Sequence, residues 1–240
     1  MRPDRQHGAG AIEFAVVFLI FAALMTGLFE MTRVYRTKHT LNTATFLAAR
    51  AGAVNHARTG PIEAELANNM ATLYTLGQRD STGLSQAVAR AKTLTALPGI
   101  GAELVSPSRE IFDRLQRLQW IRRTGEEDYR WQNVIPNDNL KYRPRTLAHF
   151  SSDSGSGQIN LQDANLLKIR SLWCHRLVVP GLDRLIFQIV NQPAFVSARQ
   201  LVCSAISGLE QDGIAPGFYL PVAADATVRM QSAIVSDDLP

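Results

Sequence analysis

The hydrophobic pattern separates an uninterrupted apolar segment at the start of the chain from a mixed sequence after it. No charged residue occurs from Phe14 to Phe29, and small or apolar residues extend this segment on both sides. A helix over residues 9–31 rises ~1.5 Å per residue, which is enough for the ~30 Å hydrocarbon thickness of a bilayer. Because such a helix has no polar face, it does not fit the surface of a soluble core. The pattern predicts a membrane-spanning helix over residues 9–31.

The same helix is expected to continue beyond the membrane over residues 32–60. After the apolar segment, no proline occurs before Pro61. Small or apolar residues recur on one face at heptad-like spacing: Val34, Leu41, Ala44, Ala48 and Ala51. Small side chains let another element approach closely, so this part of the helix is expected to pack on a globular part.

Residues 61–125 predict a helical region and residues 126–165 a loop or linker. Gly60-Pro61 ends the long helix, and Pro61 suits the first position of the next one. Apolar stripes at helical spacing then run to Gly77, from Leu84 to Leu94, and from Ile111 to Leu118. After residue 125 the pattern dissolves, and the stretches IPNDNLKYRP and SSDSGSGQ are rich in turn-forming residues.

A different periodicity marks residues 166–240. Leu166–Pro180 alternates apolar and polar positions, which indicates a strand with a half-buried face. A short apolar helix around Leu185–Val190, a segment near Ala198–Leu209 and a final strand at Ala226–Val235 follow. Few strands with long connections predict an α+β fold, in which a small antiparallel sheet and several helices pack on the long N-terminal helix.

Composition and motifs exclude several classes of function. The formal net charge is +4, and no run of five or more like charges occurs, so nucleic acid is not indicated as a partner. The five histidines are scattered singly, without cysteine or carboxylate at ligand spacing, so no metal site is predicted. No nucleophile elbow, phosphate-binding loop or dinucleotide glycine pattern occurs. We therefore predict neither enzymatic activity nor a cofactor.

The two cysteines, Cys174 and Cys203, leave two states open. In a reducing compartment they would be two buried thiols, and in an oxidising one they could form a single bridge. If this part of the chain lies outside the cytoplasm, we expect a structural disulfide.

Two stretches carry a resemblance to a known family. Gly8, followed by Ala9-Gly10-Ala11-Ile12-Glu13-Phe14 and an unbroken apolar helix, resembles the processing site of type IVb prepilins. The stretch LNTATFLAARAGAV, Leu41–Val54, resembles the segment that follows in TadE-like proteins, the minor pilins or pseudopilins of tight-adherence pilus systems. The spacing of the first stretch, Gly8 to Phe14, matches that family without a gap, and the resemblance covers residues 8–58.

The resemblance implies a role for each residue of the first motif. Residues 1–8 correspond to a leader that prepilin peptidase removes after Gly8, which makes Ala9 the new N-terminus. Glu13 then takes the place of the fifth mature residue and Phe14 that of the sixth. In the family, the glutamate is thought to pair with the N-terminal amine of a neighbouring subunit and so to set the register of assembly. A carboxylate that merely reaches the lipid headgroups is the alternative for Glu13.

The resemblance also implies a location and partners. The protein would cross the inner membrane once, with a cytoplasmic N-terminus and an extracytoplasmic domain, and would contact membrane lipid, the major pilin, other minor pilins and the assembly platform. Charge alone leaves the orientation open, because basic residues flank the span on both sides: Arg2 and Arg5 before it, and Arg33, Arg36 and Lys38 after it.

Other functions of the N-terminal segment remain as alternatives. An uncleaved signal anchor whose outer domain binds a partner or ligand is the main one. A cleaved secretory signal fits less well, since no A-x-A site ends the apolar core.

Overall fold

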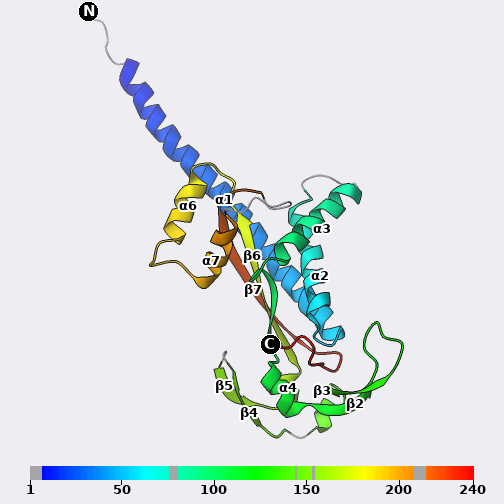
Figure 1. The fold of residues 1–240 in the computed structure, drawn as a ribbon. Coiled ribbons are helices and arrows are strands. Elements are labelled where there is room, and N and C mark those ends of the chain that lie inside the picture. Colours follow the sequence, from blue (N-terminus) through cyan, green and yellow to red (C-terminus); the bar gives the residue numbers. More distant parts are fainter. Residues whose placement is uncertain (1–6, 76–80, 144, 153–154, 208–214) are drawn as a thin grey trace, which may run out of the picture.

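One helix of 48 residues, α1 (His7–Val54), forms the axis of the molecule. This computed structural model describes residues 7–75, 81–143, 145–152, 155–207 and 215–240. The N-terminal half of α1 projects away from all other elements, which gather around its C-terminal part (Figure 1). At ~1.5 Å per residue the helix is about 72 Å long. It ends at Val54 rather than at residue 60, because His56 and Ala57 adopt left-handed backbone conformations (φ 63° and 61°).

The alanine-rich face of α1 is buried against the rest of the fold. Leu41, Ala44 and Ala48 expose no surface. The closest approach is at Gly52, where a Cβ atom would stand 2.7 Å from Cδ1 of Ile62 on α2 (Thr59–Met70). The absence of a side chain at Gly52 therefore allows α2 to pack directly on α1.

The C-terminal end of α1 is closed by a segment from the other end of the chain. The backbone N–H groups of Gln231 and Ser232 donate to the Ala53 carbonyl at 3.0 and 3.1 Å. The Ser232 hydroxyl donates to the same carbonyl at 3.0 Å and accepts from the His56 N–H at 2.9 Å. These bonds satisfy groups that a helix end otherwise leaves unpaired.

The apolar stripes predict a helical region over residues 61–125, but the structure places strands as well as helices there. The region contains α2, a short 3-10 helix η1 (Ala71–Leu73), α3 (Ser81–Thr95), β1 (Gly101–Ser106), α4 (Arg109–Leu115) and β2 (Arg117–Ile121). Gly99 and Gly101 have positive φ angles (78° and 103°), which turn the chain from α3 into a strand. The helix α4 stops early because the residues after it pair with β3 (Arg130–Val134), with Trp120 opposite Trp131.

The prediction of a linker over residues 126–165 is also wrong. That range holds β3, the 3-10 turn η2 (Leu140–Tyr142), β4 (Ala148–Ser152), β5 (Gly155–Ile159) and α5 (Leu161–Ala164). Strands β4 and β5 pair with each other in an antiparallel hairpin. Their serines and glycines give no apolar alternation, so backbone pairing rather than a buried face defines them.

The main sheet has three antiparallel strands in the order β1-β6-β7. Its centre is β6 (Leu166–Arg176), the strand predicted from the alternating pattern, and its long partner is β7 (Tyr219–Arg229). Both strands run beside the C-terminal part of α1 (Figure 1). The alternation holds for Leu167 and Ile169, but from Ser171 to His175 every residue of β6 is buried, because both faces are covered there.

The last strand lies earlier in the chain than the predicted Ala226–Val235. Pro221 is part of β7 and is paired with Cys174, which the edge position of β7 permits because an edge strand leaves one row of N–H groups unpaired. Beyond Arg229 only Ile234 pairs again, in an isolated bridge with Ile135.

Two short helices cross between β6 and β7. They are α6 (Leu182–Val190) and α7 (Ala198–Ile206), close to the predicted positions. Helix α7 packs on the sheet and buries Gln200, Cys203 and Ile206, whereas no residue of α6 is buried. With the long helix, further helices and small antiparallel sheets, the predicted α+β class is confirmed.

Candidate functional site

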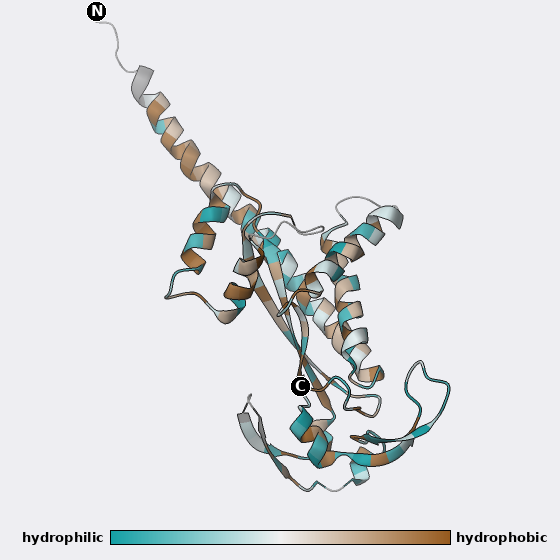
Figure 2. Cartoon of the chain, in the orientation of Figure 1, coloured by the Kyte–Doolittle hydropathy of each residue, from teal (hydrophilic) through white to brown (hydrophobic). Residues whose placement is uncertain are grey.

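The projecting half of α1 is an apolar surface without a cover. Large apolar side chains along it are more than half exposed, among them Phe14 (71%), Leu19 (67%) and Leu28 (64%). Figure 2 shows this half as a mostly hydrophobic rod that ends where the other elements begin. Within the described part of the chain, α1 is the one helix long and apolar enough to cross a membrane, and the apolar window itself is not buried at all. Such a surface needs lipid or another protein around it.

The residues of the predicted processing and assembly site all lie on this one helix. Since α1 begins at His7, Gly8 and Ala9 belong to its first turn. Glu13 is exposed one turn further on, and among the described residues no hydrogen bond or ion pair reaches its carboxylate. The Phe14 ring stacks on Phe18 at 6.1 Å between centroids. No other part of the fold lies over these side chains, so any partner of Glu13 comes from outside the described fold.

A buried polar cluster, which the sequence did not suggest, sits where α1 joins the domain. Glu30 is only 2% exposed, and its Oε1 accepts a hydrogen bond from the Val178 N–H at 3.3 Å. The same oxygen lies 3.6 Å from Arg33 Nη1 and 3.7 Å from His175 Nε2. On its other side the His175 ring meets the Thr37 hydroxyl, at 2.8 Å from Nδ1. We call these four side chains, Glu30, Arg33, Thr37 and His175, the exit cluster.

Within the exit cluster, the negative charge of Glu30 is balanced by the positive charge of Arg33, and His175 does not contribute a charge at neutral pH. Burial, together with the nearby Arg33 guanidinium, lowers the pKa of His175 to about 4, so its ring is neutral at neutral pH. The contact at Nδ1 is a hydrogen bond with the Thr37 hydroxyl, whereas His175 Nε2, Arg33 Nη1 and Glu30 Oε2 are buried without a hydrogen-bond partner in the described structure. Glu30 and Thr37 are seven residues apart and therefore lie on the same face of α1. This spacing of two polar residues is the one signal of the cluster in the sequence.

A cavity of about 690 Å³ adjoins the exit cluster. Four arginines, Arg33, Arg36, Arg90 and Arg176, contribute to its lining, and no carboxylate does among the described residues. Aromatic residues form other parts of the wall, and burial raises the pKa of Tyr74 and of Tyr219 there. The cavity is therefore cationic and partly aromatic.

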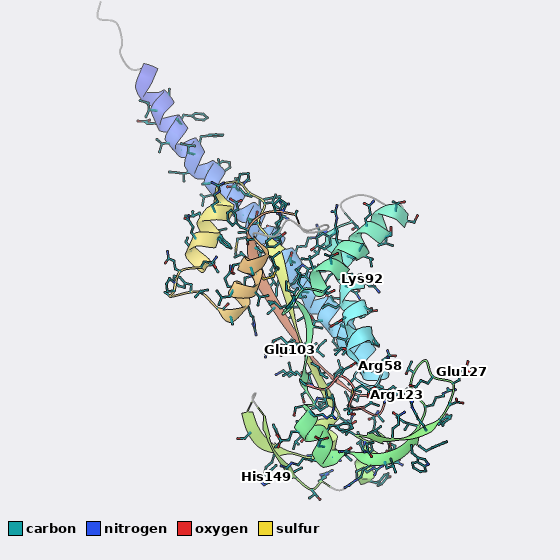
Figure 3. All side chains as sticks on the ribbon, in the orientation of Figure 1. Arg58, Lys92, Glu103, Arg123, Glu127 and His149 are labelled. Carbon is teal, nitrogen blue, oxygen red and sulfur yellow. A yellow bond between two sulfur atoms is a disulfide. The ribbon has the colours of Figure 1, made fainter. Side chains whose placement is uncertain are left out.

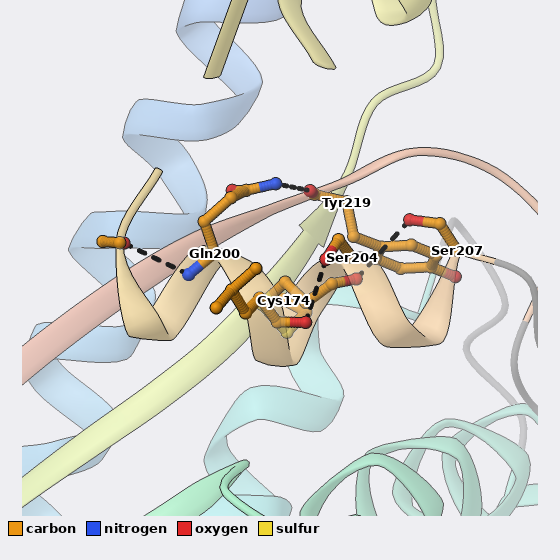
Figure 4. The surroundings of a disulfide bond; sticks show 8 residues. Cys174, Gln200, Ser204, Ser207 and Tyr219 are labelled. Atoms are coloured by element: carbon orange, nitrogen blue, oxygen red, sulfur yellow. Dashed lines mark hydrogen bonds between the residues drawn. A yellow bond between two sulfur atoms is a disulfide. The ribbon is translucent and has the colours of Figure 1, made fainter. Parts of the chain in front are cut away.

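Cys174 and Cys203 are joined by a disulfide in the structure, with 5.4 Å between their Cα atoms (Figure 4). The bond links the end of β6 to α7, and both sulfurs are buried. Nearby, Gln200 Nε2 donates to the Tyr219 carbonyl at 3.4 Å, which adds a second link between α7 and the sheet.

No constellation of reactive side chains is visible in the described ranges. No group of three or more His, Cys, Asp or Glu there could hold a metal ion. The side chains labelled in Figure 3 are scattered over helices, strands and connections, from Lys92 on α3 to His149 on β4, and none lines the cavity. The buried ring of His56 bonds only to backbone, through the Ala233 carbonyl at 2.8 Å and the Thr124 N–H at 3.2 Å.

The family model described as TadE-like protein matches residues 8–50. The N-terminal segment of this chain is TadE-like. The resemblance expected from the Gly8–Phe14 motif and from the stretch after Leu41 is thereby confirmed. A TadE-like segment indicates a component associated with a Tad pilus, in a family of structural rather than enzymatic proteins, and its long apolar helix indicates anchoring in a membrane.

Neither the curated proteins nor the solved structures contain a match to this chain. The TadE-like match covers the projecting half of α1 and most of the part that packs on the sheet, and it stops just before Gly52. The function of the remaining domain is therefore argued from its geometry.

Proposed function

We propose that this chain is a minor pilin or pseudopilin of a tight-adherence pilus or a related secretion apparatus. Residues 9–31 anchor it in the inner membrane, with the N-terminus in the cytoplasm and the domain after residue 31 outside it. One observation carries the proposal: a TadE-like helix projects from the fold with its apolar surface uncovered, and the acidic residue near its start, Glu13, has no partner among the described residues.

Removal of residues 1–8 by prepilin peptidase gives Glu13 a counter-charge. Cleavage after Gly8 creates an ammonium group on Ala9, four residues before Glu13 and on the same face of the helix. In hydrocarbon a lone carboxylate or a lone ammonium is costly, and each is stabilised by the other. In a stored subunit the Ala9 ammonium can neutralise its own Glu13. In an assembly the ammonium of a neighbouring copy or pilin takes that place and fixes the axial register.

The disulfide supports the proposed orientation. Structural disulfides persist in the periplasm and at cell surfaces, whereas cytosolic thiols are kept reduced. A buried bond between Cys174 and Cys203 therefore suits a domain outside the cytoplasm.

The first residue of the protein extracted from membranes tests the proposal. A mature chain that starts at Ala9 supports it. A chain that starts at Met1 favours the uncleaved signal anchor, and one that starts beyond Phe29 favours a secreted protein. Either of these two results overturns the proposed processing.

A matched pair of variants tests the role of Glu13. Glu13→Ala should leave leader removal intact but abolish co-purification with pilin subunits. Glu63→Ala, which removes an exposed acid from α2, should change neither property. Undiminished co-purification of Glu13→Ala would contradict the assembly role.

The second candidate function is partner or ligand binding by the outer domain of an uncleaved anchor. The cationic cavity beside the exit cluster is the observation that favours it, because four arginines there suit an anionic group. The two candidates separate on the N-terminal residue described above.

A further inference from the structure

Helix α6 is amphipathic, and part of its apolar surface is left exposed by the protein. Leu185 is 54% exposed and Ile189 46%, and no residue of the helix is buried. Phe187, on another side, makes the contact with the fold, with its ring 4.8 Å from that of Phe218. The apolar stripe of Leu182, Leu185 and Ile189 follows the i, i+3, i+7 spacing of one helix face.

The position of α6 along α1 is set by the exit cluster. Val178, four residues before α6, bonds to Glu30 through its N–H, and Glu30 lies at the end of the apolar half of α1. Figure 1 shows α6 beside α1 where the free half of that helix begins, and it extends sideways from the rod rather than along it. Helix α6 therefore lies at the level where the hydrocarbon of a membrane around residues 9–31 gives way to headgroups.

We propose that α6 lies in the membrane surface as an interfacial helix, with Leu182, Leu185 and Ile189 at the boundary of headgroups and acyl chains. This inference rests on the proposed membrane anchoring by α1. An amphipathic helix at that depth removes its apolar face from water by entering the bilayer by ~5–10 Å.

Charge around α6 favours lipid over a second protein surface. Arg36, which follows the apolar segment of α1, and Arg184 on α6 are both exposed. Phosphate groups of lipids attract guanidinium groups at this depth. The exposed apolar side chains of α6 lie at the level where those of α1 end, so one bilayer can cover both. The domain would then be held against the membrane at two points, α1 and α6, which limits its tilt and rotation.

Quenching by brominated phospholipids tests the position of α6 in the full chain reconstituted into vesicles. The variants Ile189→Trp and Gln188→Trp place an indole at adjacent positions ~100° apart around the helix, so they report on different faces. The wild-type tryptophans give a common background. With bromine on the upper acyl carbons, the emission added by Ile189→Trp should be largely lost, while that added by Gln188→Trp should largely persist. Leu185→Trp, on the same stripe, should behave like Ile189→Trp.

The outcomes separate this inference from the proposed anchoring. If the protein floats with the vesicles but bromine quenches Gln188→Trp and Ile189→Trp equally, or quenches neither, α6 is not an interfacial helix. The proposed anchoring by α1 then still stands. An indole at 189 that neither bromine nor aqueous acrylamide reaches indicates a protein partner, such as a second copy, and also overturns it. Protein that fails to float overturns both proposals.

Discussion

Replacing both cysteines by alanine should loosen α7 from the sheet. The disulfide closes a loop between residues separated by 29 positions, and this loop contains α6 and α7 up to Cys203. Closing the loop lowers the conformational entropy of the unfolded chain. This stabilises the folded state by about 3–4 kcal/mol for a loop of this length. Helix α6 has no buried residue, and α7 keeps only the Gln200 bond and a few buried side chains. The loop should therefore open before the rest of the fold.

Hydrogen exchange in the full chain, followed by mass spectrometry, measures this opening. In the double variant Cys174→Ala/Cys203→Ala, amides of α7 should open on the order of several hundredfold more often, the equivalent of 3–4 kcal/mol. Amides in the middle of β6 should change little, because α1, β1 and β7 hold that strand.

A control on the same helix is Ser204→Ala, since the Ser204 hydroxyl bonds only within α7, to the Leu201 carbonyl. It should exchange like the wild type. If the double variant stays within about tenfold of the wild type, loop closure does not hold α7 and the reasoning is refuted. Free thiols in protein taken from the native envelope would refute the bond itself.

Three further predictions concern the packing and charge of α1. The pKa of His175 is about 4 in the folded protein and 6.5 ordinarily, so between these pH values the unfolded chain binds a proton that the folded protein does not. The free energy of unfolding, measured in denaturant titrations, should be highest above pH 6.5 and fall by up to about 3 kcal/mol towards pH 4. The variant His175→Gln should remove this dependence on pH. Glu30→Gln should destabilise the fold by about 1–3 kcal/mol by leaving a cation without its counter-charge, whereas Asp113→Asn, in an exposed pair, should have little effect; equal midpoints would contradict the role of the exit cluster. Gly52→Val should cost about 1–3 kcal/mol through its contact with α2, while Gly60→Ala, where nothing lies within 4 Å, should be nearly neutral in the same titration.

The sequence carried strong signals where a long element buries one regular face. Helix α1 and strand β6 were predictable because their apolar residues repeat at periods of seven and two over many residues. The hairpin of β4 and β5 was not, since serine and glycine give it no apolar face. The start of β7 was missed because a proline, Pro221, normally argues against a strand. A strand can contain it here because β7 lies at the edge of the sheet, which the sequence does not show.

The candidate site divides in the same way. Gly8 and Glu13 could be assigned from a local motif that follows one helix. The exit cluster could not, because Thr37 and His175 meet across 138 positions of sequence, and their contact depends on how β6 lies on α1. Glu30 stands out in the sequence as a charged residue at the end of an apolar run, but its partner Val178 lies in the segment predicted as a strand, and that strand ends at Arg176 before reaching it.

The closure of α1 by Gln231 and Ser232 imposes an order on biogenesis. The donors that bond to the Ala53 carbonyl are translated nearly two hundred residues after it, so the C-terminal end of α1 lacks these bonds while most of the chain is being translated. Domains generally mature as units once their contacts are all available, and here the final contacts come from the tail. An interrupted translation product that ends before Gln231 would therefore contain the whole of α1 but lack the bonds that close its C-terminal end.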